Sequence, residues 1–224
     1  MPSPPETRST ASSEEAVPAA RNGVTNLTAG DEAEKVQRQR DVQRLLALIG
    51  RTQFLSLVPR GNGEGLVRVA TFEPGDPAAV AWVARNDAEG RASYYSLSIV
   101  REGLNKKAKK ADIVAARGVF VDIDPPKDGR RFDRAWALEK LNGMDVPPSY
   151  IVDSGGGFQP VWLFDKPVEN LDLVEGINLR LAELLSGDHC FNIDRLLRVP
   201  GSLNTPDAKK AATGRVPRRA SFVA

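Results

Sequence analysis

The 224-residue chain has few of the side chains that build disulfide frameworks and zinc sites: one cysteine, Cys190, and one histidine, His189. A single cysteine excludes an internal disulfide framework and fits a reducing compartment. A zinc site, which usually takes several nitrogen or sulfur ligands, is not expected either. Any catalysis by this chain therefore has to depend on carboxylates, arginines, lysines and hydroxyls.

Long apolar runs and a large net charge are also missing. No apolar run approaches the roughly 20 residues that span a bilayer, and the N-terminus lacks the charged-then-apolar pattern of a secretion signal. We therefore expect a cytoplasmic protein with no membrane partner. The net charge of +2 points to no class of partner, and 41% hydrophobic with 27% charged residues is typical of a globular domain.

The composition changes along the chain and divides it into three parts. Residues 1–33 are rich in Pro, Ser, Thr, Ala and Glu, which predicts a disordered tail. Residues 34–210 carry the periodic apolar patterns of a folded domain. Residues 211–224 form a basic C-terminal extension.

Apolar periodicity predicts short strands and helices that alternate irregularly. Helices are expected from about residue 31 to Gly50, and over 131–141 and 171–185. Strands are expected over 54–58, 66–72, 80–85, 94–100, 149–152 and 161–164, with a turn at 86–90 that joins two of them into a hairpin. The pattern lacks βαβ repeats and favours an α+β domain with a mixed or antiparallel sheet.

One stretch, GVFVDIDPP at 118–126, combines a buried strand with two acids. Asp122 and Asp124 are two residues apart, so on a strand both carboxylates project the same way. The two prolines that follow cannot donate to a sheet and end the strand. Close carboxylates repel each other, and a hard divalent cation with oxygen ligands relieves the repulsion. The alternative is a solvated turn after the strand.

A second stretch, SGGGFQP at 154–160, joins two predicted strands through Gly155, Gly156 and Gly157. Such a turn can present backbone N–H groups to phosphate oxygens, with Ser154 and Gln159 as side-chain donors. The alternative is a flexible hairpin loop. It is not a P-loop, because the lysine of that motif is missing.

A third stretch, at 187–204, places two acids beside two arginines. Arg195 and Arg198 are three residues apart, which predicts one side of a helical turn, and their guanidinium groups match phosphate oxygens. Asp188 or Asp194 is the candidate for a third metal-binding carboxylate. The alternative is structural, with an aspartate as a helix cap and the arginines as its ion-pair partners.

Two basic stretches flank these motifs. The first, over 101–110, contains Lys106, Lys107, Lys109 and Lys110, and the second begins with Lys209 and Lys210. Either they are solvated surface or they face a polyanion such as single-stranded DNA.

The three motifs together predict more than each does alone. An acid pair, a glycine turn, a third acid and paired arginines are the components of metal-dependent nucleotidyl transfer.

The ordered motifs VFVDIDPP, SGGGFQPVW and GD followed by DRLLRVPGSLN resemble the archaeo-eukaryotic primase superfamily, most closely plasmid RepB-type primases and phage primase-polymerases. The resemblance covers about residues 50–210. It implies an RNA-recognition-motif-like palm with a flanking N-terminal α/β unit. It also implies a nucleotidyltransferase that uses two Mg²⁺ or Mn²⁺ ions to synthesise short primers from NTPs or dNTPs on a single-stranded DNA template.

The resemblance assigns metal binding and catalysis to Asp122, Asp124 and Asp188, with Asp194 as the rival third acid. It assigns nucleotide binding to the glycine turn (Ser154 to Gly157), Gln159, Arg195 and Arg198. The biological role that it implies is replication of plasmid, phage or mobile-element DNA, with a helicase or relaxase as a partner. Many family members have histidine where this chain has Gln159, and Gln can donate a hydrogen bond but carries no charge. The near neighbour His189 is expected to be an ordinary surface residue.

Two other functions remain open at this point. One is a catalytically weakened primase fold that binds single-stranded DNA. The other is a sugar-nucleotide transferase, which leaves the paired arginines and the basic flanks unexplained. The sequence does not decide between ribose and deoxyribose substrates, or between a stand-alone enzyme and part of a larger replication protein.

Overall fold

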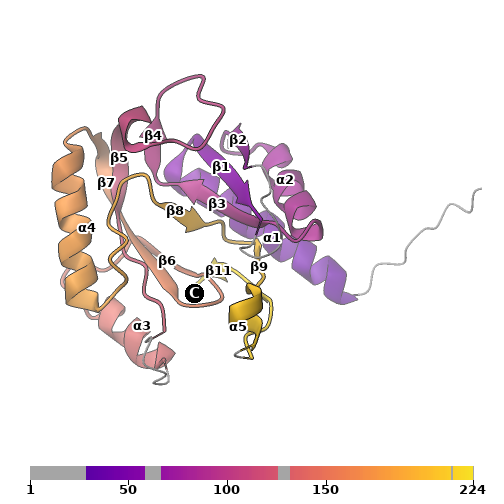
Figure 1. The fold of residues 1–224 in the computed structure, drawn as a ribbon. Helices are drawn as coiled ribbons and strands as arrows, with labels where there is room; N and C mark the ends of the chain where they lie inside the picture. Colours follow the sequence, from indigo (N-terminus) through magenta and orange to yellow (C-terminus); the bar gives the residue numbers. More distant parts are fainter. Residues whose placement is uncertain (1–28, 59–66, 126–131, 213, 224) are drawn as a thin grey trace, which may run out of the picture.

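The computed structural model describes residues 29–58, 67–125, 132–212 and 214–223, and two antiparallel sheets form its centre (Figure 1). The four-stranded sheet has the order β2 (Arg68–Phe72), β1 (Thr52–Leu57), β3 (Ala92–Ser96) and β8 (Leu196–Arg198). The five-stranded sheet has the order β11 (Ser221–Phe222), β6 (Tyr150–Asp153), β7 (Phe158–Val168), β5 (Ile113–Phe120) and β4 (Ser98–Val100). A small third sheet pairs β10 (Arg218–Arg219) with β9 (Leu203–Asn204).

Helices surround the two sheets. They are α1 (Ala29–Ile49), α2 (Pro77–Ala88), α3 (Arg134–Asn142), α4 (Leu171–Leu185) and the short α5 (Ala208–Ala212), with a 3₁₀ turn at Lys110–Asp112. In Figure 1, α1 and α2 lie on the side of the four-stranded sheet, and α3 and α4 on the side of the five-stranded sheet. The mixture of helices and antiparallel sheets confirms the predicted α+β class.

Side-chain alternation in the five-stranded sheet creates two apolar cores. Phe120, Tyr150 and Val161 are cross-strand neighbours whose side chains pack with α1, α2 and the four-stranded sheet. The adjacent Val119 and Trp162 point to the opposite face, where they pack with α3 and α4. The first face, between the two sheets, is the one that leads to the functional site.

Helix α1 confirms the predicted burial of its apolar stripe and corrects the extent of the predicted tail. Val42, Leu45 and Leu46 are fully buried, and Gly50 follows the helix with a positive φ of 73°. Residues 29–33, which we assigned to the tail, form the first turns of α1, so the helix begins two residues before the start expected near residue 31. Residues 1–28 lie outside the described residues.

The predicted strand over 80–85 is wrong, because this segment lies within α2. Asp76 caps the helix by accepting a hydrogen bond from Ala78 N, and Pro77 occupies the first helical turn. The hairpin expected with 94–100 is absent for the same reason. Residues 94–100 instead divide between β3 of the four-stranded sheet and β4 of the five-stranded sheet.

The C-terminal residues belong to the same fold. Strand β11 pairs with β6 at the edge of the five-stranded sheet, and Ala220 is fully buried. Within the predicted basic extension, 211–224, residues 219–223 are therefore packed against the rest of the domain, while 211, 212, 214 and 216–218 are exposed. No helix in the described ranges has the length and apolarity that a membrane span requires.

Candidate active site

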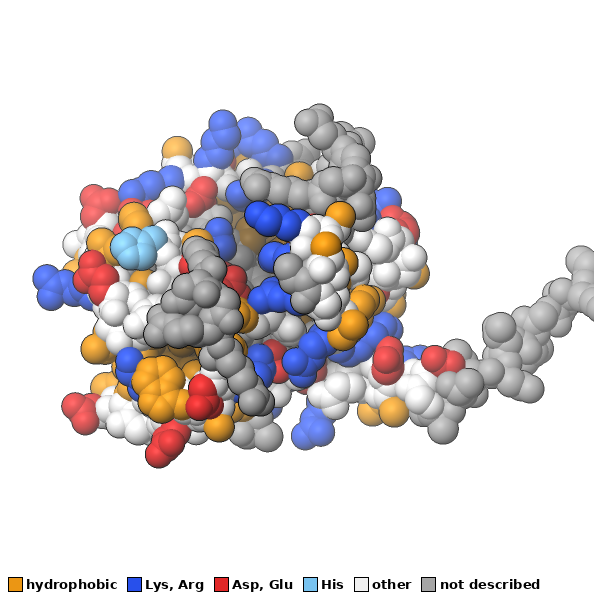
Figure 2. Space-filling model, turned by 60° about the horizontal axis from the view of Figure 1, so that its bottom comes forward, with side chains coloured by type: hydrophobic (Ala, Val, Ile, Leu, Met, Phe, Trp, Pro, Cys, Tyr) orange, Lys and Arg blue, Asp and Glu red, His pale blue; other side chains and the backbone are white. Residues whose placement is uncertain are grey.

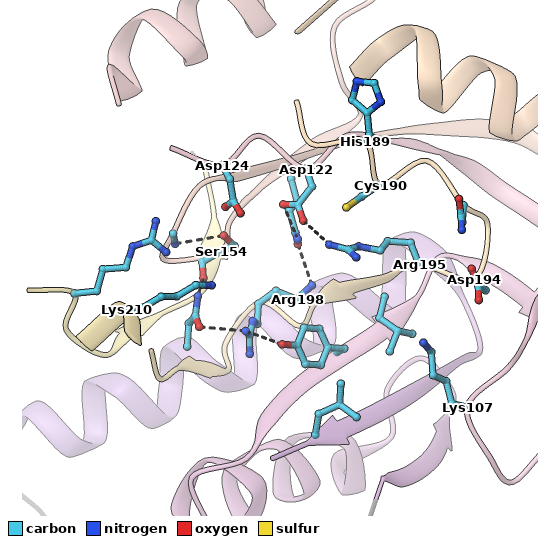
Figure 3. Close-up of a pocket in the computed structure, with 18 residues that line it drawn as sticks. Lys107, Asp122, Asp124, Ser154, His189, Cys190, Asp194, Arg195, Arg198 and Lys210 are labelled. Carbon is cyan, nitrogen blue, oxygen red and sulfur yellow. Dashed lines mark hydrogen bonds and ion pairs between the residues drawn. The ribbon is translucent and has the colours of Figure 1, made fainter. Parts of the chain in front are cut away.

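A cavity of about 560 Å³ lies between the two sheets and collects most of the predicted site residues (Figure 3). In the view of Figure 2, Lys and Arg side chains gather around the hollow in the middle of this face. The lining residues are Leu57, Tyr94, Lys107, Asp122, Asp124, Ser154, Gly156, Gln159, His189, Cys190, Asn192, Asp194, Arg195, Leu196, Arg198, Asn204, Lys210 and Arg215.

Asp122 and Asp124 enter the cavity from the end of β5. The strand ends at Phe120, but Ile123 exchanges two backbone hydrogen bonds of 2.9 Å with Phe158, which keeps the chain extended. Alternation then turns Asp122 to the same side as Phe120, toward the four-stranded sheet. Both carboxylates line the same cavity, as the sequence predicted.

Asp122 is buried and held by two side chains. Gln159 Nε2 donates to its Oδ1 over 3.3 Å, and Arg195 Nη2 lies 3.3 Å from its Oδ2. Gln159 is bound at its other end too, because its Oε1 accepts a hydrogen bond of 2.9 Å from Arg198 N. The Gln159 amide thus connects the acid on one sheet with the backbone of β8 on the other.

Asp188 lies beside the acid pair because Gly187 permits a close approach of the chain. A Cβ at Gly187 would come within 2.3 Å of Val121 Cγ1, and the Asp188 N–H donates to the Asp122 carbonyl over 2.7 Å. Figure 3 places Asp194 beyond Arg195, on the side of Lys107. Asp188 is the electrostatic neighbour of the pair, because its charge raises the pKa of Asp124, whereas Asp194 rather than Asp188 is among the residues that line the cavity.

The electrostatics of Asp124 show how crowded the acids are. Burial, and then the negative charges of Asp122 and Asp188, raise the pKa of Asp124 above its ordinary value of 3.8, while Lys210 and Arg215 act against this. In the described part of the chain, no group of three or more His, Cys, Asp or Glu side chains could hold a metal ion as placed. One or two carboxylates suffice for Mg²⁺, which keeps several waters and prefers oxygen ligands, so the donor set fits this ion.

Arg198 stands on strand β8, so the predicted helical turn at the two arginines is wrong. Its guanidinium lies 4.4 Å from the centre of the Tyr94 ring, and Nη2 donates to the Tyr94 hydroxyl (3.0 Å) and to Asn204 Oδ1 (3.1 Å). Only 8% of the residue is exposed, and Nη1 has no hydrogen-bond partner among the described residues. Arg198 lines the cavity, and such a fixed cation suits an anionic ligand.

The glycine turn is built differently from our expectation. The Gly155 N–H donates to Asp153 Oδ1 (2.9 Å), and the N–H groups of Gly156 (3.3 Å) and Gly157 (3.1 Å) donate to Ser154 Oγ. These donors are used inside the turn rather than left open for phosphate. Close packing explains why residue 157 is a glycine, because a Cβ at this position would lie 2.0 Å from the Ile123 carbonyl oxygen. The turn still reaches the cavity through Ser154 and Gly156.

Of the six predicted DNA-binding lysines, Lys107 and Lys210 line the cavity. Lys110 pairs instead with Glu175 (2.6 Å) and Asp172 (3.4 Å) on α4. The others, Lys106, Lys109 and Lys209, are exposed outside the cavity lining.

Several lining residues were missed by the sequence analysis. Tyr94 and Asn204 come from β3 and β9, and nothing in their local sequence marks them. Arg215 lies in the second basic stretch, and that basic composition was the signal that could have identified it.

The cavity lining also includes the single cysteine and the single histidine of the chain. Burial raises the pKa of the Cys190 thiol, which disfavours a reactive thiolate. The His189 ring is turned away from Asp122 and Asp124 in Figure 3.

Comparison with solved structures shows the same fold in primases. The chain is similar to the AEP domain of the cyanophage S-2L primase-polymerase, with 19% identity, a TM-score of 0.60, and coverage of 83% of this chain and 89% of that one. It is also similar to the primase RepB′, with 14% identity, a TM-score of 0.57, and coverage of 84% of this chain and 56% of that one.

A further similar structure is the catalytic domain of RepB′ in complex with initiator DNA, with 14% identity, a TM-score of 0.57, and coverage of 84% of this chain and 85% of that one. No family model matches the chain, and no curated protein matches its sequence. The structural likeness confirms the expected fold, which is the fold of these primase domains.

Proposed function

We propose that this chain is the catalytic domain of a DNA primase or primase-polymerase, a nucleotidyltransferase that synthesises short primers on single-stranded DNA. Its context is plasmid, phage or mobile-element replication, where a helicase or relaxase is the expected partner. The observation that carries the proposal is the set of side chains that line one cavity in a primase fold. There the acids Asp122 and Asp124 face the cations of Arg195, Arg198 and Lys210.

Acids and cations line the same cavity, which supports a role in nucleotidyl transfer. Asp122 and Asp124, with Asp188 beside them, are the proposed ligands of Mg²⁺ or Mn²⁺. Metal ions held by these carboxylates would supply positive charge for activating a 3′-hydroxyl and for stabilising the leaving pyrophosphate. Arg198 and Lys210 line the same cavity, which supports a role for their positive charges in binding the triphosphate of the incoming nucleotide.

The proposed reaction joins two nucleotides. The 3′-oxygen of one forms a bond to the α-phosphorus of the other, the bond from that phosphorus to the bridging oxygen breaks, and pyrophosphate leaves. The hydroxyl proton passes to solvent. This chain contributes orientation and charge: Arg195 and Gln159 fix the Asp122 carboxylate, and the arginines and lysines neutralise the phosphates.

The template strand needs a basic path beside the cavity. Lys107, at the cavity edge, is a candidate for this contact, together with the exposed Lys106 and Lys109 of the same loop. The structure of RepB′ with initiator DNA shows that a protein of this fold binds DNA.

The test is primer synthesis on single-stranded DNA with labelled nucleotides and Mg²⁺ or Mn²⁺. Wild type is expected to make metal-dependent products, and Asp122→Asn and Asp124→Asn to lose them. Asp165→Asn, which changes an exposed aspartate on β7, is the matched control and is expected to retain activity. Equal products from wild type and the two cavity variants contradict the proposal.

A second candidate function is a single-stranded DNA-binding module without catalysis. It is favoured by the glycine turn, whose N–H groups are used internally, and by the lack of a three-carboxylate metal cluster among the described residues. Salt-dependent DNA binding by wild type, with no nucleotide incorporation in either metal, supports this candidate over the first.

A further inference from the structure

A second, smaller cavity borders the acid pair. Its volume is about 200 Å³, and Asp124 lines both this cavity and the larger one. We call it the apolar cavity, because most of its lining is apolar. Its lining residues are Ile123, Asp124, Phe132, Asp133, Trp136, Ala137, Lys140, Leu185 and Ser186.

The two cavities lie on opposite sides of the chain that extends from β5. Ile123 packs with Ala137 of α3 and Leu185 of α4, on the face of the sheet away from the four-stranded sheet. Asp122, next to it in sequence, points to the other face and lines only the larger cavity. Asp124 therefore stands where the two spaces meet.

Trp136 is the unusual residue of the apolar cavity. It is 57% exposed, whereas the other two tryptophans of the chain, Trp82 and Trp162, are 7% and 8% exposed. An exposed tryptophan contributes little to a core, and its flat ring is a good surface for another flat ring. Trp136 therefore has the properties of a binding residue more than of a packing residue.

A cation stands over this ring. Lys140 Nζ lies 5.2 Å from the centre of the Trp136 ring and donates to the Leu184 carbonyl over 2.9 Å. The carbonyl fixes the ammonium group, which has two further protons to donate. An aromatic ring beside a fixed cation is how proteins bind single-stranded nucleic acid, with bases on the ring and phosphates near the charge.

We propose that the apolar cavity binds the nucleotide whose 3′-hydroxyl is extended, with its base stacked on Trp136 and a phosphate near Lys140. The inference deepens the proposed function and rests on it. Nucleotidyl transfer brings two nucleotides to one acid pair. The larger cavity holds the cations that suit the triphosphate of the incoming nucleotide, and Asp124 also lines the apolar cavity, so a nucleotide bound there would lie beside the same acid. A volume of about 200 Å³ is small for a drug-sized ligand and admits a single base.

Fluorescence provides a test that needs no catalysis. Trp136 is the exposed tryptophan, so titration with the single-stranded trinucleotide of deoxyadenosine is expected to quench the emission of wild type without metal. Trp136→Ala is expected to weaken binding of a labelled trinucleotide about tenfold, since one base stack is lost. Trp136→Phe keeps an aromatic ring and is expected to retain most of the affinity. Leu173→Ala, which changes an exposed apolar residue of α4 outside the apolar cavity, is the matched control.

A kinetic measurement separates this inference from the proposed function. In extension of a primed template, Trp136→Ala is expected to raise the KM for the primer about tenfold and to leave the KM for the incoming nucleotide unchanged. Wild-type quenching without any nucleotide incorporation contradicts the proposed function and leaves the binding site standing. Unchanged emission on saturation, or wild-type trinucleotide affinity in a folded Trp136→Ala, overturns the inference even when primers are made.

Discussion

Gln159 donates a hydrogen bond to the carboxylate of Asp122, with 3.3 Å between Nε2 and Oδ1. The same amide accepts from Arg198 N on the other sheet, so both of its ends are bound inside the protein. We expected Gln159 to contact the triphosphate directly. Its contacts favour a positioning role, in which the amide holds the acid of one sheet at a fixed place relative to the arginine strand of the other.

Replacing Gln159 by Met is expected to lower kcat more than it changes the KM for nucleotide. Met keeps the volume but removes both hydrogen bonds, so the Asp122 carboxylate loses its orientation and the buried Arg198 N–H loses its acceptor. An unpaired buried donor costs about 1–3 kcal/mol of unfolding free energy. Primer-extension kinetics and urea denaturation measure the two effects. A rise in nucleotide KM alone, with unchanged kcat, contradicts the positioning role.

Asp124→Asn is expected to stabilise the protein in the absence of metal and to abolish stabilisation by Mn²⁺. Burial, Asp122 and Asp188 raise the pKa of Asp124, so the wild-type carboxylate destabilises the fold as it ionises. The stabilisation by Asn is expected to be about 1 kcal/mol or less, because partial exposure screens the repulsion.

The pH dependence of this effect follows from the sign of the shift. A raised pKa in the folded state means that stability is lost as pH rises through that pKa. We therefore expect Asp124→Asn to be more stable than wild type at neutral pH. The difference is expected to vanish when the pH falls below 3.8, the ordinary pKa of an aspartate. Thermal melts from pH 3 to 8, with Asp165→Asn as control, measure it. A variant less stable than wild type at neutral pH without metal contradicts the account.

Arg198→Lys is expected to raise the KM for nucleotide about tenfold. Lysine keeps the positive charge, but it lacks the planar fork that stacks on Tyr94 and is held in place by the hydrogen bonds of Nη2. Steady-state primer extension at varied nucleotide concentration measures the effect. Arg180→Lys, at an exposed position of α4, provides the control for a loss of guanidinium elsewhere. An Arg198→Lys variant with wild-type KM shows that the fork is not used.

Much of the candidate site was predictable because it depends on local geometry. The spacing of Asp122 and Asp124 on an apolar strand was enough to place both carboxylates in one cavity. The helical stripe of Val42, Leu45 and Leu46 was equally local. In each case the strand or helix period alone decides where the side chains point.

Other parts required contacts between distant segments. Tyr94 lies beside Arg198 because β3 pairs with β8, 104 residues apart in sequence, and no local pattern encodes that pairing. The error at α2 was avoidable. The apolar Val80 and Trp82 suggested a strand, while Asp76 and Pro77 before them carried the signal of a helix start.

The C-terminal segment is expected to matter for stability and for the site. Arg219 Nη1 lies 3.0 Å from Asp87 Oδ2 on α2, and Nη2 bonds Glu34 on α1. Burial raises the pKa of Asp87, and Arg219 is among the groups that counteract this. Arg219→Ala is expected to cost about 3 kcal/mol of unfolding free energy, because it leaves a buried carboxylate with fewer partners.

The matched control is Arg218→Ala, the exposed neighbour on β10. Urea denaturation of the two variants measures the difference. Equal stability of Arg219→Ala and Arg218→Ala shows that the ion pairs do not anchor this segment.

The central claim is that one cavity binds divalent metal and triphosphate together, and a crystal structure with Mn²⁺ and a non-hydrolysable deoxynucleoside triphosphate tests it most directly. We predict anomalous density for Mn²⁺ at Asp122 and Asp124, with Asp188 adjacent, and the triphosphate along Arg198 and Lys210. Manganese and nucleotide bound elsewhere, with this cavity empty at saturating concentrations, would contradict the account.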